Sequence, residues 1–333
     1  MSAVDRPGEF DLIEQYFKPL ASSDGAFDLE DDAATFTPPP GHDLVVSVDT
    51  LVAGVHFFIG DPADLIARKA LRVNLSDLVA KGAKPIGYLL SLGLPEDWTE
   101  GWVRRFCAGL EIDQHNYGFS LLGGDTVKSP ERFVITITVI GHCPHKAMVR
   151  RGTAQAGDNI VVSGTIGDAA LGLICRRFPE EAGDVDLDEP HRMDLVGRYQ
   201  LPEPPLAGIS ALREFAQAAM DISDGLVGDL EKMCIASGTG ARVHSDRIPL
   251  SPAATIMISG DDQLFKTAIS GGDDYELLTS VSQQNTAPFL EALAQAGVTG
   301  TVIGEMTENA GKVQILDAAG APMVLEHGSY RHF

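Results

Sequence analysis

Several short segments of the chain place a carboxylate directly after an apolar run or a turn of small residues. They are Asp31-Asp32, Ser47-Val48-Asp49, Gly124-Asp125, Asp221-Ile222-Ser223-Asp224 and Gly272-Asp273. Asp77 adds a carboxylate one helical turn after Asn74, on the same face of a predicted helix. Each segment alone is explained by an Asp that caps a turn. If the segments converge, their charges repel and can stay together only around bound cations.

Oxygen ligands at scattered positions suit Mg²⁺, which keeps several waters and bridges phosphates. The pattern therefore predicts Mg-dependent phosphate chemistry. The sequence motifs of other common phosphate-binding and hydrolase sites are absent. The segment 123–129 has no Gly before its Lys, as a phosphate-binding loop requires, and the chain has neither a G-x-G-x-x-G after a strand nor a G-x-S-x-G. A Ser-His-Asp hydrolase is therefore poorly supported.

The composition is that of a globular protein with a strongly acidic balance. The 333 residues are 44% hydrophobic and carry a formal net charge of −22, which disfavours nucleic acid and anionic membranes as partners. The four Cys are far apart without a C-x-x-C pair and the His do not cluster, so we expect neither a zinc nor a haem site. Without a membrane-length apolar run or a signal-peptide pattern, we expect a cytoplasmic protein.

Strands that alternate with helices must position these carboxylates. The periodicity predicts strands at 45–49, 86–94, 119–122, 133–141, 159–163, 277–281 and 298–303, and a hairpin at 313–325. It predicts helices at 9–20, 61–81, 98–116, 169–177, 206–217, 226–237 and 287–296. The expected fold class is α/β (α+β), and the polar, turn-rich stretch 144–157 predicts a boundary between domains at 1–150 and 151–333.

A set of motifs occurs in one order along nearly the whole chain. They are Glu30–Ala34, Ser47–Phe57, Val73–Leu78, Gly123–Thr126, Ser163–Asp168, Asp221–Leu226, Gly271–Leu277 and Gly328–Phe333. Together they closely resemble the thiamine-monophosphate kinase family, within the superfamily of aminoimidazole-ribonucleotide synthetase. The resemblance implies an N-terminal sheet that forms a barrel across a homodimer, and a C-terminal α/β domain. It also implies transfer of a phosphate from ATP to thiamine monophosphate, which gives thiamine diphosphate.

The resemblance assigns roles by position. Several Mg²⁺ ions are implied at Asp32, Ser47, Val48, Asp49, Asp77, Asp125, Asp221 and Asp224. Tyr117, Gly124, Asp125, Arg150 and Ser223 are implied to line the ATP site, and His56, Asp273 and Tyr330 to contact thiamine monophosphate. Asp273 stands where the family often has Glu. Without the motif, His56 is explained as a histidine packed beside Phe57 and Phe58.

The implied acceptor needs no catalytic general base, because a phosphate monoester is already largely ionised at neutral pH, with a second pKa of about 6. We therefore expect direct in-line transfer without a phosphoenzyme, driven by positioning and charge neutralisation. Two other functions remain open. One is another ATP-dependent enzyme of the superfamily, such as aminoimidazole-ribonucleotide synthetase. The other is a non-catalytic regulator that binds Mg-nucleotide, since fold alone does not fix function.

Overall fold

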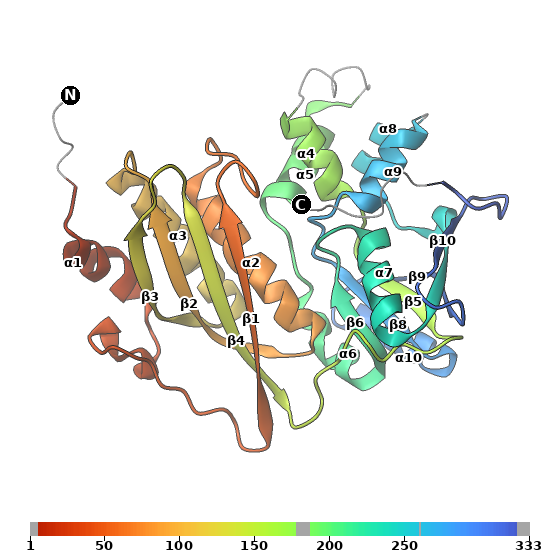
Figure 1. The fold of residues 1–333 in the computed structure, drawn as a ribbon, viewed down its shortest axis with the longest axis horizontal. Coiled ribbons are helices and arrows are strands. Elements are labelled where there is room, and N and C mark those ends of the chain that lie inside the picture. Colours follow the sequence, from red (N-terminus) through yellow and green to blue (C-terminus); the bar gives the residue numbers. More distant parts are fainter. Residues whose placement is uncertain (1–5, 178–186, 260, 325–333) are drawn as a thin grey trace. The chain divides into compact units, whose positions relative to one another are not determined.

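The structure is a computed structural model that describes residues 6–177, 187–259 and 261–324. The chain forms two compact units, coloured along the sequence in Figure 1. Unit 1 is Met1–Leu78 with Ala83–Lys146, and unit 2 is Val79–Gly82 with Ala147–Phe333. No helix in the described part of the chain is long and apolar enough to cross a bilayer.

Unit 1 is built on a four-stranded sheet in the order β1-β4-β2-β3. β1 (His42–Val52) and β2 (Lys84–Leu94) both pair antiparallel with β4 (Val134–Pro144), and β2 pairs parallel with β3 (Ser120–Lys128). The parallel pair requires a crossover, which α3 (Glu100–Tyr117) supplies. The side chain of Thr99 caps the start of α3, and Gly118 ends it in the left-handed conformation.

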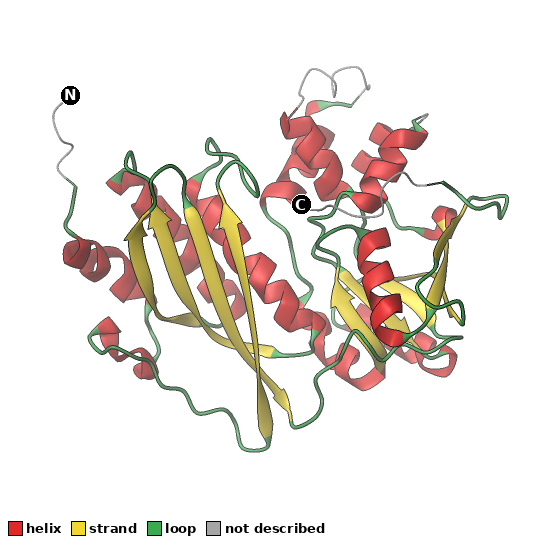
Figure 2. Ribbon diagram, viewed as in Figure 1, coloured by secondary structure: helices red, strands yellow, loops and turns green. Residues whose placement is uncertain are grey.

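The two long helices of unit 1 cover one face of this sheet only (Figure 2). α2 (Ala63–Ala80) packs so closely on α3 that a Cβ on Gly109 would lie 2.3 Å from the carbonyl oxygen of Asp64. Alternate residues of β1 reveal the two faces: Val45 and Leu51 are buried, whereas Val46 and Val48 are 59% and 56% exposed. We call the side without helices the open face.

The N-terminal segment is less regular than the predicted helix 9–20. It contains α1 (Glu9–Leu12), a π-helical turn (Ile13–Phe17) and a 3-10 turn (Lys18–Leu20). Pro19 lacks an amide hydrogen and therefore cannot continue a regular α-helix. A further turn, Asp24–Leu29, carries Phe27, Asp28 and Leu29 at positive φ angles of 49°, 55° and 58°.

Unit 2 contains a six-stranded sheet in the order β10-β7-β9-β5-β8-β6. Among the described strand pairs of this sheet, only β10–β7 is parallel. The strands are β5 (Asn159–Ser163), β6 (Ala216–Asp221), β7 (Gly240–His244), β8 (Leu277–Val281), β9 (Gly300–Thr307) and β10 (Val313–Leu316). The helices are α4 (Asp168–Arg177), α5 (Glu189–Gln200), α6 (Ile209–Phe215), α7 (Leu226–Ser237), α8 (Pro252–Ile258), α9 (Asp262–Ser270) and α10 (Gln283–Gln295).

Both faces of the unit 2 sheet are covered. Ile160 and Val162 of β5 belong to a core with Leu230 and Met233 of α7, whereas the intervening Val161 is buried on the other side. On that side α10 packs on β8 and β9. A strand buried on both faces reads as a continuous apolar run, which explains why β5 was predictable.

Most predicted elements are present, and several differences lie in unit 2. Residues 216–217, expected to extend the helix 206–217, begin β6 instead. The predicted hairpin at 313–325 is present in short form: the amide of Asp317 donates to the carbonyl oxygen of Ala321, the amide of Met323 donates to that of Ile315, and Leu316 bridges Pro322. The sequence did not predict that β10 also pairs in parallel with the distant β7. α5 was missed, although Asp188 caps it and Pro190 stands in its first turn.

Candidate active site

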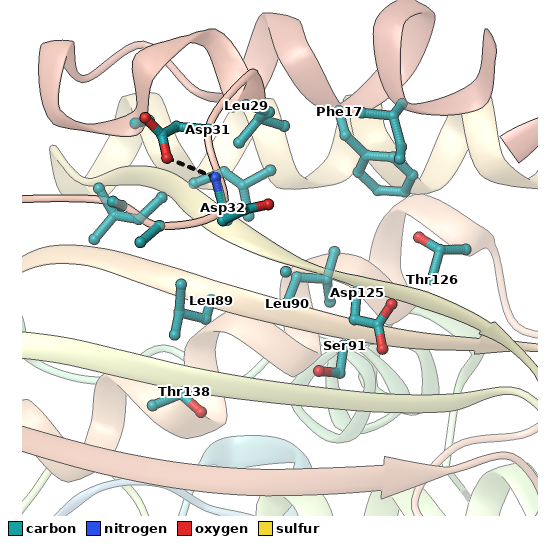
Figure 3. A pocket seen from close by; sticks show the side chains of 18 of the residues that line it. Phe17, Leu29, Asp31, Asp32, Leu89, Leu90, Ser91, Asp125, Thr126 and Thr138 are labelled. Atoms are coloured by element: carbon teal, nitrogen blue, oxygen red, sulfur yellow. Dashed lines mark hydrogen bonds between the residues drawn. The ribbon is translucent and has the colours of Figure 1, made fainter. Parts of the chain in front are cut away.

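The open face of unit 1 holds a cavity of about 640 Å³, between the strands β2 and β3 and the N-terminal segment. Asp31 and Asp32 lie on the segment that passes over the strands, and Ser91, Asp125 and Thr138 come from the strands (Figure 3). The other part of the lining is apolar and includes Ile13, Phe17, Ala26, Leu29 and Phe36. The cavity thus combines an acidic part with an apolar part.

The parallel register of β2 and β3 places Asp125 in this cavity. Ser91 lies opposite Asp125, and Leu90 lies opposite Gly124. A Cβ on Gly124 would lie 1.9 Å from the carbonyl oxygen of Leu90, so this position requires glycine. Across the cavity, the amide of Asp32 donates a 2.7 Å hydrogen bond to Oδ1 of Asp31, which orients the pair.

A second group of predicted residues lies on the helix side of the same sheet. Ser47 Oγ donates to Oδ2 of Asp77 at 2.5 Å, and the amide of Asp49 donates to Oδ1 of Asn74 at 2.9 Å. Asn74 is itself oriented by donating to the carbonyl oxygen of Ala70. The predicted shared face of Asn74 and Asp77 is therefore used to contact β1. Asp32 and Asp125 belong to the open face, so the predicted acidic ligands of unit 1 are divided between the two faces of the sheet.

His56 is fixed by the turn that follows β1. Its Nδ1 accepts a 3.0 Å hydrogen bond from the amide of Val52, and its own amide donates to the carbonyl oxygen of Val52. A neutral imidazole whose Nδ1 accepts carries its proton on Nε2. The half-buried ring can therefore present Nε2–H as a donor.

Tyr117, at the end of α3, is held by a buried ion pair. Nε and an Nη atom of Arg72 donate to the buried carboxylate of Asp113 at 2.6 and 3.0 Å. The guanidinium carbon of Arg72 lies 5.3 Å from the centre of the Tyr117 ring, at cation–π distance. Tyr117 is not among the residues that line the cavity.

In unit 2, two loops lie against each other and bring together Ser223, Asp224 and Asp273. The amide of Asp273 donates to the carbonyl oxygen of Ser223 at 2.9 Å, and the amide of Tyr275 to that of Ile222 at 2.8 Å. Gly272 has a φ of 79°, and a Cβ there would lie 2.3 Å from the same Ser223 oxygen. These bonds continue the β6–β8 pairing past the ends of the strands.

The predicted ligand Asp221 ends β6 and is buried, whereas Asp224 is partly exposed. Arg150 is tied through its backbone, because its carbonyl oxygen accepts from the amide of Ala219 at 3.3 Å, and its side chain is exposed. Tyr330 lies outside the described residues. Nowhere in the described ranges do three His, Cys, Asp or Glu side chains gather closely enough to hold a metal ion by themselves.

Beneath the loop 223–224 lies a pair of charges that the sequence analysis missed. Asp229 is fully buried, and Lys232 donates both to it and to Asp224. Burial raises the pKa of Asp229. Burial alone would lower the pKa of Lys232, but its hydrogen bonds to Asp224 and Asp229 outweigh this and raise it. The spacing of one helical turn between Asp229 and Lys232 was the available signal.

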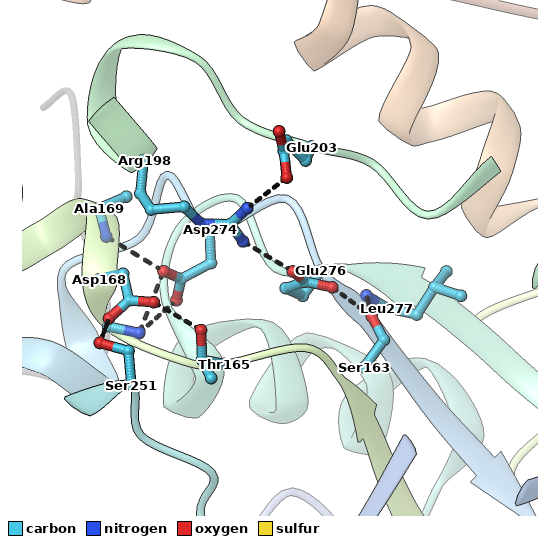
Figure 4. A network of polar contacts seen from close by, with 11 residues as sticks. Ser163, Thr165, Asp168, Ala169, Arg198, Glu203, Ser251, Asp274, Glu276 and Leu277 are labelled. Carbon is cyan, nitrogen blue, oxygen red and sulfur yellow. Dashed lines mark hydrogen bonds and ion pairs between the residues drawn. The ribbon is translucent and has the colours of Figure 1, made fainter. Parts of the chain in front are cut away.

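A second missed group anchors the loop that carries Asp273 (Figure 4). Asp274 is buried and accepts from the amide of Gly167, while Glu276 accepts from Ser163 Oγ at 2.5 Å and from Arg198 at 2.8 Å. Burial, together with the nearby Asp168 and Glu276, raises the pKa of Asp274 well above its ordinary value. Burial also raises the pKa of Glu276. The alternation is clear: positions 274 and 276 point inward, and 273 and 275 are partly exposed.

Known proteins resemble this chain in both sequence and fold. Residues 30–143 match the AIR synthase related protein N-terminal domain, and residues 155–316 match the corresponding C-terminal domain. The thiamine-monophosphate kinase of Caulobacter vibrioides is 41% identical over 313 residues, which cover 93% of this chain and 87% of that protein.

Two solved structures extend the comparison. The crystal structure of thiamine-monophosphate kinase from Stenotrophomonas maltophilia is 35% identical with a TM-score of 0.78, over 86% of this chain and 89% of that one. A structure described as AaThiL complexed with AMPPCP and TMP is 30% identical with a TM-score of 0.77, over 100% and 99% of the two chains. With its two-domain α/β fold of the AIR synthase type and this identity over most of its length, the chain belongs to the thiamine-monophosphate kinase family.

Proposed function

We propose that this protein transfers the terminal phosphoryl group of ATP to thiamine monophosphate, giving ADP and thiamine diphosphate. The observation that carries the proposal is the cavity on the open face, where Asp32 and Asp125 lie beside an apolar lining. An adenine ring suits the apolar part, and phosphates bridged by cations suit the acidic part. The close backbone approach of Gly124 to Leu90 fixes the part of β3 that carries Asp125.

The donor chemistry fits Mg²⁺. Asp32, Asp49, Asp77 and Asp125 supply carboxylates, Ser47 a hydroxyl and Val48 a backbone carbonyl, all of them hard oxygen donors. Asp221 and Asp224 are the carboxylates proposed as metal ligands in unit 2. Since no three such acidic side chains gather closely among the described residues, phosphate oxygens and water would complete the coordination. Bound Mg²⁺ would neutralise the facing phosphates during transfer.

The protein's own residues would hold the two anions in line. Tyr117, Gly124, Arg150 and Ser223 would contact ATP, and His56 would donate from Nε2 to thiamine monophosphate together with Asp273 and Tyr330. No residue needs to remove a proton, because the acceptor phosphate is ionised at neutral pH. The transfer would therefore be direct, with no phosphoenzyme, and would rest on positioning and electrostatics.

We further propose a homodimer in which the open faces of two sheets close into a barrel. Large apolar side chains on this face are exposed, namely Leu44 (44%), Val46 (59%), Val48 (56%) and Leu89 (38%). Contiguous exposed apolar surface of this kind marks an interaction site. In this proposal residues 1–150 form the domain for ATP, Mg²⁺ and dimerisation, residues 151–333 form the C-terminal domain, and the enzyme works in the cytoplasm.

Two other functions share the fold: a different ATP-dependent reaction of the superfamily, and regulation by Mg-nucleotide binding without catalysis. The family membership favours the kinase. Incubation with Mg-ATP and thiamine monophosphate, followed by chromatography, discriminates among the three. The kinase yields thiamine diphosphate; nucleotide binding by a folded chain that forms no such product would refute the proposal.

A further inference from the structure

Lys232 already neutralises a carboxylate that the proposed function assigns to a metal ion. Its ammonium group, on α7, contacts Oδ2 of Asp224 and lies 2.8 Å from Oδ1 of Asp229. The side chains of Lys232 and Asp224 are 39% and 37% exposed, so an ion from solvent can reach both. Asp229 is fully buried.

Asp229 holds the loop that carries Asp224 and the ammonium group of Lys232 next to each other. Its Oδ2 accepts from the amides of Ser223 and Asp224, each at 2.9 Å, while its Oδ1 accepts from Lys232. One buried carboxylate therefore anchors the backbone of the loop and the ammonium group that faces this loop. Lys232 thus has a second partner, Asp229, besides Asp224.

We propose that Lys232 is a built-in counter-cation of Asp224, which a divalent ion must displace, so that Lys232 sets the Mg²⁺ concentration at which this ligand is occupied. The inference rests on the proposed role of Asp224 as a metal ligand and goes beyond it. It makes Lys232 a positioning residue, because Lys232 acts on the metal through Asp224 and needs no contact with either substrate.

The direction of the effect follows from charge. The ammonium group of Lys232 already neutralises part of the negative charge of Asp224, so a divalent ion is attracted to Asp224 less strongly. The ion is also repelled by the ammonium group, which Asp229 holds nearby. Both effects weaken metal binding. Solvent screens them because the side chains are partly exposed, so we expect removal of the charge to tighten binding by on the order of tenfold.

The test measures binding of Mn²⁺, as a spectroscopic substitute for Mg²⁺, to the full-length protein by electron paramagnetic resonance. Lys232→Met removes the charge and keeps the length of the side chain, and Lys232→Arg is the matched control that keeps the charge. Lys232→Gln replaces Lys232→Met if the latter does not fold. Asp224→Asn, alone and combined with Lys232→Met, shows whether the effect acts through Asp224.

The proposal predicts that the Mn²⁺ dissociation constant falls about tenfold in Lys232→Met, stays within about twofold in Lys232→Arg, and is insensitive to Lys232→Met once Asp224 is Asn. Three results would each overturn it. The first is Mn²⁺ affinity that is unchanged or lower in both Lys232→Met and Lys232→Gln. The second is Mn²⁺ affinity that does not change in Asp224→Asn, and the third is tighter binding caused by Lys232→Met even when Asp224 is Asn. These results are separable from kinase activity. If thiamine diphosphate forms but Mn²⁺ affinity does not change as predicted, only the inference about Lys232 is refuted. If Mn²⁺ affinity changes as predicted but no thiamine diphosphate forms, only the kinase proposal is refuted.

Discussion

The amide of Gly167 donates to both carboxylate oxygens of Asp274, at 3.0 and 2.9 Å. Gly167 lies in the turn between β5 and α4, and Asp274 lies in the loop before β8, so this bond joins two distant segments of unit 2. The next residue back, Asp273, has a positive φ of 66° and is partly exposed. A strained conformation at this position persists only because its neighbours are anchored.

Asp274→Asn tests the buried carboxyl group through the pH dependence of stability. The raised pKa means that the folded protein keeps a proton at pH values where the unfolded chain, with its ordinary pKa of 3.8, has lost it. The contribution to stability is therefore fully present below that ordinary value and is lost as pH rises through the raised pKa. Glu276, whose pKa is also raised, acts in the same direction.

We accordingly expect the free energy of unfolding to fall more steeply with rising pH in the wild type than in Asp274→Asn, by up to about 1.4 kcal/mol per pH unit. Urea unfolding at several values between about pH 5 and pH 8 measures this slope. Asp188→Asn, at the exposed N-cap of α5, is the control and should keep the wild-type slope in this range. Parallel curves for wild type and Asp274→Asn would contradict the account.

Asp49→Asn and Asp125→Asn test the proposed metal ligands. Each removes one negative charge at nearly constant shape, and we expect kcat/KM to fall by at least about 100-fold, the size of effect seen when a transition-state contact is lost. Asp43→Asn, on the same strand as Asp49 but bonded to His145 and Lys146, is the matched control. Near wild-type activity in Asp49→Asn or Asp125→Asn would mean that the residue is not a metal ligand.

His56→Asn separates substrate binding from local structure. The Asn oxygen can take over the role of Nδ1 as acceptor for the amide of Val52, but Asn offers no donor where Nε2–H stood. We expect the KM for thiamine monophosphate to rise about tenfold, equivalent to about 1.4 kcal/mol, with the KM for ATP and the melting temperature nearly unchanged. Steady-state kinetics with each substrate varied checks this, and an unchanged KM for thiamine monophosphate would favour a merely packed histidine.

Val46→Glu tests the proposed dimer. Val46 is 59% exposed on the open face and has no role in the proposed chemistry, so a charge there should disfavour only association. Light scattering should give the mass of a dimer for the wild type and of a monomer for the variant. Ile112→Glu is the control, because Ile112 is 44% exposed on α3. A monomeric wild type, or a dimer that tolerates Val46→Glu, would count against the barrel.

The sequence predicted what depends on local signals. The strand expected at 45–49 lies within β1, which continues past Asp49 to Val52, the helix expected at 61–81 is α2, and Asn74 and Asp77 do share a face. What it could not predict depends on segments far apart in the chain. One example is the pairing of β10 with β7. Another is the position of Asp125 and Asp49 on opposite faces of the sheet, which depends on how the strands of unit 1 are paired and in which register. The bond from Gly167 to Asp274, which anchors the loop that carries Asp273, likewise depends on tertiary packing.

The most direct test of the central claim follows the reaction itself by ³¹P NMR, in a mixture that contains Mg²⁺ and in which ATP and thiamine monophosphate are the only phosphorus compounds at the start. The account predicts that thiamine diphosphate and ADP appear in equal amounts, only when Mg²⁺ is present, and that Asp125→Asn protein forms almost none. ADP formed without thiamine diphosphate, or no reaction by the folded wild-type chain, would contradict it.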